Sequence, residues 1–150
     1  MRLSLKTMTD VDLPVIETWF DDKDTKKRIS IDNLKTWFDH VLNNEHYFVS
    51  LACLDRTSIG MVMLEIYDNH SAAVAFLIAA QYRGRGYSKQ MLQMALDKMV
   101  SEDLIVTASV ETDNYRSIRC LESSGFKRAS SQPDEDNLFH FTWRHLDGLG

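Results

Sequence analysis

The stretch FLIAAQYRGRGYSKQMLQMAL, residues 76–96, joins an apolar strand to an amphipathic helix through a turn that contains two glycines. The spacing of Met91, Leu92 and Ala95 predicts a helix that starts just after Gly86. The first turn of a helix has N–H groups without partners and the positive end of the helix dipole. Because glycine lets a backbone approach an anion closely, this turn indicates a cradle for phosphate.

The turn carries its own positive charge on Arg83, Arg85 and Lys89. The whole chain is acidic, with 17 basic and 22 acidic residues and a net charge of −5, which argues against a nucleic-acid binder. The Walker pattern GxxxxGK[ST] is absent, and the dinucleotide pattern GxGxxG fails because Lys89 takes the place of its third glycine. The motif alone is also consistent with a turn that binds no ligand and whose two arginines are solvated.

Outward from this stretch, the hydrophobic periodicity predicts a mixed α/β domain. Residues 21–28 read as a charged loop, and residues 47–78 as a three-stranded antiparallel meander. The helix predicted to start after Gly86 then links two strands in a β-α-β crossover. The other expected helices cover residues 11–20, 31–42 and 114–123; the expected strands cover residues 3–6, 47–54, 59–67, 72–78, 104–110, 126–128 and 138–144.

The length and composition fit one globular domain over residues 1–150, with 44% apolar and 26% charged residues. The two cysteines, Cys53 and Cys120, lie far apart and have no metal-ligand spacing, so we expect buried thiols and no metal. No segment is apolar enough for a signal peptide or a membrane span. These features favour a cytoplasmic protein with no membrane partner.

Together with NYRSIRCLESSGF, residues 114–126, and the order of elements, the opening stretch resembles the GCN5-related N-acetyltransferase (GNAT) superfamily. The likeness is loosely to the branch of ribosomal-protein N-terminal and aminoglycoside acetyltransferases. The acetyl-CoA signature of the family, Q/R-x-x-G-x-G/A, fits residues 81–86 or residues 83–88. The second register is preferred because it starts the helix where the periodicity does. The resemblance implies a mostly antiparallel central sheet, about four helices, and a splayed pair formed by residues 72–78 and 104–110.

The resemblance also implies acetyl-CoA as co-substrate, with its pantetheine arm paired to the main chain of residues 76–78. The turn would hold the pyrophosphate through its amides. Residues 76–78 can equally be plain core, and Asn114 with Ser117 can be a simple helix cap. The implied cofactor-binding residues are Phe76, Leu77, Ile78, Arg83, Gly84, Arg85, Gly86, Tyr87, Ser88, Lys89, Asn114 and Ser117.

Many relatives use a tyrosine on the later helix to protonate the departing thiolate, and Leu121 takes its place here; Cys120 is expected to point elsewhere. The candidate bases for the amine are Glu65 and Glu111, although each can be a surface carboxylate. Some relatives carry a glutamate two positions before Glu111, where this chain has Ser109. The sequence suggests no Cys/His or Ser/His constellation.

The sequence thus predicts acetyl transfer from acetyl-CoA to a primary amine by direct attack in a ternary complex. The acceptor is a small amine, an aminoglycoside-like polyamine or a peptide N-terminus, and acidic loops at residues 21–24 and 134–136 favour a cationic one. The main alternative is a catalytically weak acyl-CoA-binding or regulatory module. A nucleotide-binding domain of another kind is a third. We expect a monomer or a homodimer.

Overall fold

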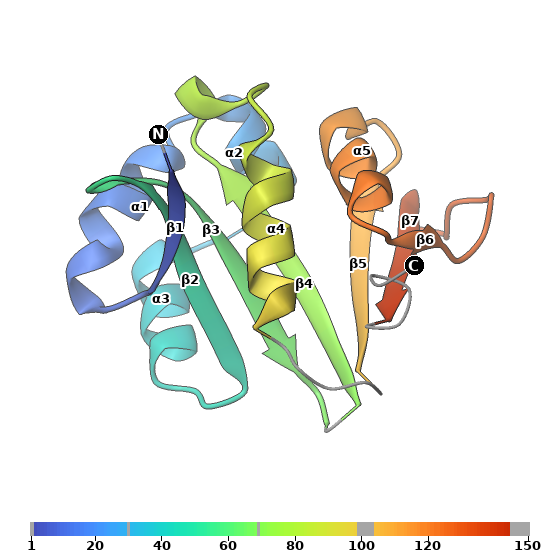
Figure 1. Cartoon of the computed structure of the whole chain (residues 1–150), viewed down its shortest axis with the longest axis horizontal. Coiled ribbons are helices and arrows are strands. Elements are labelled where there is room, and N and C mark those ends of the chain that lie inside the picture. Colours follow the sequence, from blue (N-terminus) through green and yellow to red (C-terminus); the bar gives the residue numbers. More distant parts are fainter. Residues whose placement is uncertain (1, 30, 69, 99–103, 145–150) are drawn as a thin grey trace.

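The computed structural model describes residues 2–29, 31–68, 70–98 and 104–144. These residues form one seven-stranded sheet with the order β1-β2-β3-β4-β5-β7-β6 (Figure 1). The strands are β1 (Leu3–Thr7), β2 (Tyr47–Leu54), β3 (Thr57–Ile66), β4 (Ser71–Ile78), β5 (Ile105–Glu111), β6 (Lys127–Arg128) and β7 (Leu138–Arg144). The helices are α1 (Leu13–Trp19), α2 (Lys23–Arg28), α3 (Leu34–Leu42), α4 (Tyr87–Asp97) and α5 (Tyr115–Ser123), with 3₁₀ turns η1 (Asp10–Asp12) and η2 (Ala80–Tyr82).

All neighbouring strands in this sheet are antiparallel except β4 and β5. Their parallel ladder is short and joins Ser71–Ala73 to Ile105–Thr107. Beyond Ala73, β4 continues to Ile78 paired only with β3 among the described residues. The two strands therefore diverge at their carboxyl ends, as Figure 1 shows, and the expected mostly antiparallel sheet with one splayed pair is confirmed.

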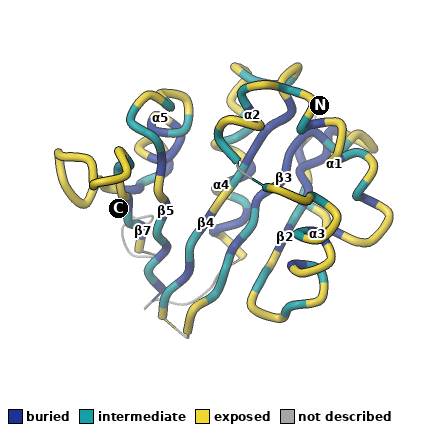
Figure 2. The backbone as a smooth tube through the Cα atoms, turned by 180° about the vertical axis from the view of Figure 1, so that it is seen from behind, coloured by how far each residue is buried: buried dark blue, intermediate teal, exposed yellow. Residues whose placement is uncertain are grey.

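Helices cover both faces of the sheet. On one face α4 packs with Met91 and Leu92 in the larger hydrophobic core, which the buried residues of α5 also join. On the other face, Ile16 of α1 and Phe38 of α3 pack in a second core. Figure 2 shows this second face, with α1, α2 and α3 in front of the strands and α4 behind them. Both faces of the middle strands are thus buried, which explains their nearly continuous apolar sequences.

Most of the charged segment at residues 21–28 is a helix, α2 (Lys23–Arg28), and not the loop that the sequence suggested. Asp22 caps it, because its side chain accepts a hydrogen bond from the N–H of Thr25 at 3.0 Å. The basic residues of its last turn complement the negative end of the helix dipole. An Asp at one end and a basic cluster at the other were therefore the sequence signals for this helix. The described α-helices number five, one more than expected.

None of the helices in the described ranges has the length and apolar character that a membrane crossing would need.

Candidate functional site

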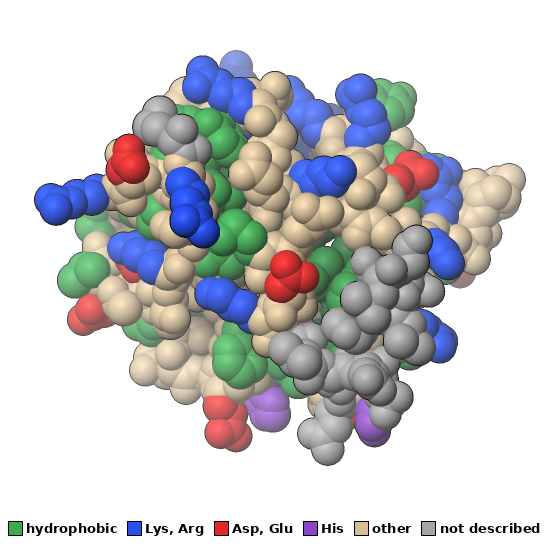
Figure 3. All heavy atoms as spheres, in the orientation of Figure 1, with side chains coloured by type: hydrophobic (Ala, Val, Ile, Leu, Met, Phe, Trp, Pro, Cys, Tyr) green, Lys and Arg blue, Asp and Glu red, His purple; other side chains and the backbone are tan. Residues whose placement is uncertain are grey.

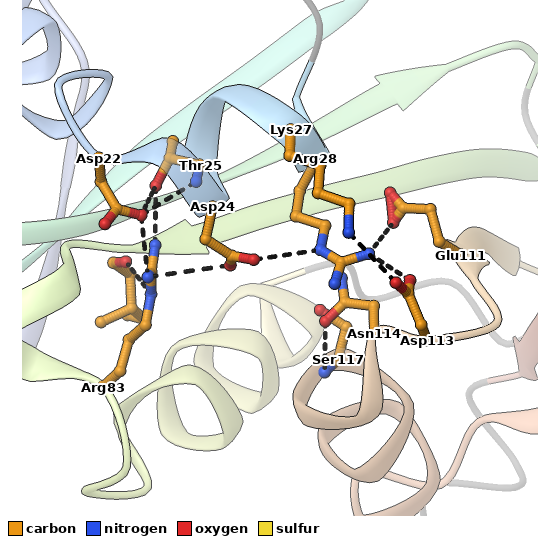
Figure 4. A network of polar contacts seen from close by, with 11 residues as sticks. Asp22, Asp24, Thr25, Lys27, Arg28, Arg83, Glu111, Asp113, Asn114 and Ser117 are labelled. Atoms are coloured by element: carbon orange, nitrogen blue, oxygen red, sulfur yellow. Dashed lines mark hydrogen bonds and ion pairs between the residues drawn. The ribbon is translucent and has the colours of Figure 1, made fainter.

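A cavity of about 790 Å³ lies at the splayed ends of β4 and β5. Its walls come from α2, the last residues of β4, the turn before α4, and α5. Segments that are far apart in the sequence thus meet there, as Figure 4 shows for α2, α5 and the turn before α4. The lining residues are Asp24, Thr25, Arg28, Ile29, Phe76, Leu77, Ile78, Tyr82, Arg83, Gly84, Gly86, Tyr87, Ser88, Lys89, Asn114, Arg116, Ser117, Arg119, Cys120, Glu122 and Ser123.

The N-terminus of α4 opens into this cavity without a side-chain cap. Gly86 stands at the cap position with φ of +81°, and Gly84 has φ of +77°. Both values lie in the left-handed region that side chains disfavour, and a Cβ at either position would meet no heavy atom within 4 Å. The first amides of α4 therefore face open space, in the geometry that binds phosphate groups. The helix starts at Tyr87, in agreement with the preferred register of the signature.

The backbone edge of β4 forms a second wall. Phe76, Leu77 and Ile78 line the cavity, and no β5 residue pairs with them among the described residues. Leu77 and Ile78 are also buried in the two cores, so their side chains have a structural role whatever their main chain binds. Unpaired N–H and C=O groups on such an edge favour a ligand that pairs as an added strand would.

Arg83 is held by protein partners on α2 and β4 (Figure 4). Its Nη1 lies 3.0 Å from Asp22 Oδ2, its Nη2 donates to Thr25 Oγ1 at 2.7 Å, and its Nε donates to the carbonyl of Ile78 at 3.2 Å. The hydrogen bond from the Thr25 N–H, and then Arg83, hold the pKa of Asp22 below its usual range. The guanidinium of Arg83 thus ties α2 to the phosphate-cradle turn, and its backbone is the part left to meet a ligand.

Arg28 makes a second tie, between α2 and the end of β5 (Figure 4). Its Nη1 lies 2.6 Å from Asp113 and 3.5 Å from Glu111. The hydrogen bond to Asp113 raises the pKa of Arg28 and, with that from Lys27, lowers the pKa of Asp113. Residues 21–24 were expected to form an acidic loop that favours a cationic acceptor, and the helical wall that α2 forms was not predicted.

Asn114 and Ser117 line the cavity and also form the helix cap. Asn114 Oδ1 accepts a hydrogen bond from the N–H of Ser117 at 3.4 Å, at the N-terminus of α5. The cap that the sequence allowed is therefore present. The ligand role of both residues stays a prediction.

On α5 the outcome differs from the sequence expectation. Cys120 lines the cavity, whereas Leu121 is 1% exposed and packs in the core. Successive residues on a helix point about 100° apart, so only one of the two can face the ligand. Burial raises the pKa of the Cys120 thiol, which disfavours its reactive thiolate form. The two cysteines are free and buried, as predicted.

All of the predicted cofactor residues line the cavity except Arg85. The Arg85 guanidinium instead lies 6.0 Å from the centre of the Tyr82 ring, in a cation–π arrangement. Arg116 and Arg119 of α5 add basic side chains to the lining. In Figure 3, Lys and Arg side chains are scattered over the face that carries α4 and α5, with few acidic ones among them. A chain of net negative charge therefore presents a basic surface around this cavity.

The two predicted catalytic carboxylates do not line the cavity. Glu65, near the end of β3, accepts a hydrogen bond from Tyr47 at 3.1 Å and pairs across the ladder with Ala73. Burial raises the pKa of Tyr67 and of Tyr47, and Glu65 raises both further. Glu111 ends β5 beside Arg28. Both glutamates lie on the side of the sheet away from α4, because the alternate residues of their strands enter the core that contains α4.

Sequence reasoning missed a contact between Ser109 and His140. Ser109 Oγ lies 2.9 Å from His140 Nδ1, and His140 Nε2 lies 2.6 Å from Asp134 Oδ2. The contact depends on the antiparallel register that places Ser109 opposite His140. A separation of 31 residues across an unknown register gives no local signal. Among the described residues, no group of three or more His, Cys, Asp or Glu side chains is placed to hold a metal ion.

Comparison with known proteins is consistent with this geometry. The family model described as an acetyltransferase (GNAT) domain matches residues 2–127. The uncharacterized N-acetyltransferase YfmK of Bacillus subtilis (strain 168) is 28% identical over 146 residues, which cover 93% of this chain and 95% of that protein.

Solved structures share the fold. A spermidine N-acetyltransferase from Vibrio cholerae in complex with CoA and spermine superposes with a TM-score of 0.85 at 15% identity, over 99% of this chain and 98% of that one. The aminoglycoside acetyltransferase AAC(6′)-Ib in complex with coenzyme A gives a TM-score of 0.81 at 18% identity, over 97% and 96% of the two chains.

Proposed function

The chain belongs to the acetyltransferase (GNAT) domain family and is an N-acetyltransferase with acetyl-CoA as co-substrate; from that premise we propose that it acetylates a small cationic amine by direct attack in a ternary complex. The observation that carries the proposal is the uncapped N-terminus of α4. It opens into a cavity whose neighbouring wall is the unpaired edge of β4. One site thus offers amides for a pyrophosphate and a strand edge for an extended amide-containing arm.

The cofactor residues divide into three groups by what they offer. Gly84, Gly86 and the first amides of α4 would hold the pyrophosphate, and Lys89 adds charge. The main chain of residues 76–78 would pair with the pantetheine arm. Asn114 would contact that arm from α5, opposite the strand edge.

In the reaction the amine nitrogen attacks the thioester carbonyl, and the C–S bond breaks after a tetrahedral intermediate forms. A backbone N–H on the open edge of β4 would stabilise the oxyanion. Leu121 supplies no proton to the leaving thiolate. A free thiol has a pKa of about 8.5, so its thiolate is a fair leaving group near neutral pH without an acid.

The acceptor side has acidic and phenolic groups. We propose that the amine enters from the face of the sheet that carries α2, where Glu65, Tyr47 and Glu111 lie. Both carboxylates already have partners, Tyr47 for one and Arg28 for the other. Their contribution as direct bases stays a prediction, and their negative charge favours a cationic acceptor. The spermine and the aminoglycoside named for the structural neighbours suggest polyamines as first compounds to test.

The experiment has two arms. Calorimetry with acetyl-CoA measures binding, and release of free CoA thiol is followed with spermine, kanamycin, butylamine and a short alanine-initiated peptide. We expect binding and turnover with at least one polycation, with butylamine the slower. Turnover of the peptide alone would contradict the small cationic acceptor. Binding without turnover on any amine would favour the acyl-CoA-binding module, to which the buried Leu121 lends some support.

A further inference from the structure

Three side chains form a hydrogen-bond chain across one face of the sheet, on β5, β7 and the loop before β7. Ser109 of β5 contacts His140 Nδ1 at 2.9 Å, and His140 of β7 contacts Asp134 at 2.6 Å. Asp134 is fixed in turn, because its Oδ1 accepts hydrogen bonds from the N–H groups of Asp136 at 2.9 Å and Leu138 at 3.0 Å. The chain therefore connects a strand residue to a carboxylate that its own loop orients.

The charge of Asp134 and the tautomer of His140 together set the direction of the hydrogen bonds. The hydrogen bond from His140, followed by the backbone N–H of Leu138, lowers the pKa of Asp134, which is therefore ionised near neutral pH and only accepts. Nε2 of a neutral His140 must then carry the hydrogen. Nδ1 is left as the acceptor for the Ser109 hydroxyl. This assignment leaves the Ser109 oxygen free to accept a proton from a third group.

The strand register places Ser109 beside the opening between β4 and β5. Thr107 is the last β5 residue paired with β4, opposite Ala73. Two residues further, Ser109 is level with Ala75 across the opening between the strands. Both residues are exposed, and the next β4 residue, Phe76, lines the cofactor cavity. Ser109 is not among the residues that line the cavity, and it faces the side of the sheet from which we propose that the amine enters.

We propose that Ser109, His140 and Asp134 form a proton relay that deprotonates the acceptor ammonium; the inference rests on the proposed function. An N–H bond of the ammonium breaks as its proton passes to Ser109 Oγ. The original hydroxyl proton of Ser109 passes to His140 Nδ1. The positive charge moves from the ammonium to an imidazolium that faces Asp134, and the neutral amine keeps its lone pair for the thioester carbonyl. The His140 side chain is 50% exposed and returns the proton to water.

The relay has charged neighbours on β5, β6, β7 and its own loop. Glu111 lies on the same face of β5, two residues on, and is paired with Arg28. Glu135 and Asp136 follow Asp134 in the loop and are exposed. On β7, Thr142 and Arg144 share the face of His140, and Lys127 of β6 lies opposite Thr142. Asp134 is thus the one carboxylate that the structure records in contact with the imidazole among the described residues.

The test measures kcat for four variants. The acceptor is the amine that the wild-type chain acetylates fastest among spermine, kanamycin, butylamine and the peptide. His140→Gln and Ser109→Ala break the relay, Glu111→Gln removes the rival base, and His46→Gln is a control at an exposed histidine in the turn before β2. We expect kcat at pH 7 to fall roughly a hundredfold in both relay variants. The loss should shrink as pH approaches the amine pKa of about 10, because the amine is then neutral without help. His46→Gln should stay within about threefold of the wild type across that pH range.

A structural role would lower kcat equally at all pH values, and that result would overturn the relay. A pH-dependent loss of kcat found only in Glu111→Gln would also overturn the relay. Detection of an acetyl group on Ser109 by mass spectrometry after mixing with acetyl-CoA would also overturn it, since the proposal gives Ser109 no covalent role. Addition of imidazole to an His140→Gly variant should restore part of the rate at pH 7. A wild-type chain that acetylates no amine overturns the proposed function and the relay together, whereas an active wild type with unaffected relay variants overturns the relay alone.

Discussion

Two helix N-termini face the same cavity, and the protein treats them in opposite ways. α4 begins after Gly86, which has no side chain to offer, and its first amides stay open. α5 begins after Asn114, whose side chain accepts from the N–H of Ser117. Both ends carry the same dipole and the same unsatisfied N–H groups. The difference is that Asn114 caps the N-terminus of α5, whereas Gly86 leaves the first amides of α4 free.

The comparison shows why a helix N-terminus is not by itself an anion site. A capping side chain at the N-terminus stabilises the helix. An N-terminus without a capping side chain has free amides that can bind an anion. The N-terminus of α2 is a third case. Asp22 caps it and also receives Arg83, which comes from the turn before α4. A closed N-terminus thus helps to position the open one.

The largest effect is expected from closing the open end. Gly86→Asp should abolish measurable acetyl-CoA binding, because it puts negative charge and bulk where the pyrophosphate would lie. Gly86→Asn is the matched control, since Asn has nearly the same size and also tolerates a positive φ. We expect Asn to weaken binding by roughly tenfold through bulk alone. Calorimetry measures the affinity of both variants for acetyl-CoA. Equal affinities would show that charge is not the cause of the weaker binding.

A smaller effect is expected from the capped end, where two substitutions separate stability from binding. Asn114→Ala should cost about 1 kcal/mol of unfolding free energy through loss of the cap. Asn114→Asp should keep that stability, because Asp caps as well as Asn. If Asn114 also contacts the pantetheine arm, both variants should raise the KM for acetyl-CoA by several-fold. Urea unfolding and steady-state kinetics give the two readouts; unchanged KM in both variants would leave Asn114 as a cap only.

The smallest effect is expected at α2 and depends on pH. The pKa of Asp22 is lowered in the folded state, so its carboxylate stabilises the fold at pH values above the usual Asp pKa of about 4. This contribution is lost as pH falls through the lowered value. The difference in unfolding free energy between the wild type and Asp22→Asn should therefore be present at pH 6 and shrink toward pH 3. Urea unfolding at the two values checks it, and a constant difference would contradict the linkage.

Local sequence signals predicted most of the fold and the open N-terminus of α4. The apolar run at residues 47–54, the alternation at residues 138–144 and the periodicity before Gly125 predicted two strands and a helix at or near their observed bounds. Gly125 has φ of +96°, as a glycine after a helix often does. The assignment of residues 21–28 to a loop was wrong, because a six-residue helix has too little apolar periodicity to show. The expectation for Cys120 was wrong because the ligand-facing side of α5 depends on how the helix is rotated against the sheet.

The sequence by itself determined the open N-terminus of α4, because two glycines, an apolar strand and a periodic helix are all local features within residues 76–96. Only the tertiary structure decided what surrounds it. Arg83 turned out to bind α2 through its guanidinium, and Ser109 met His140 across a strand pair. Both results depend on long-range packing and on register. A shift of one residue in the pairing of β5 with β7 would turn His140 to the opposite face, and nothing near either residue in the sequence records which register is chosen.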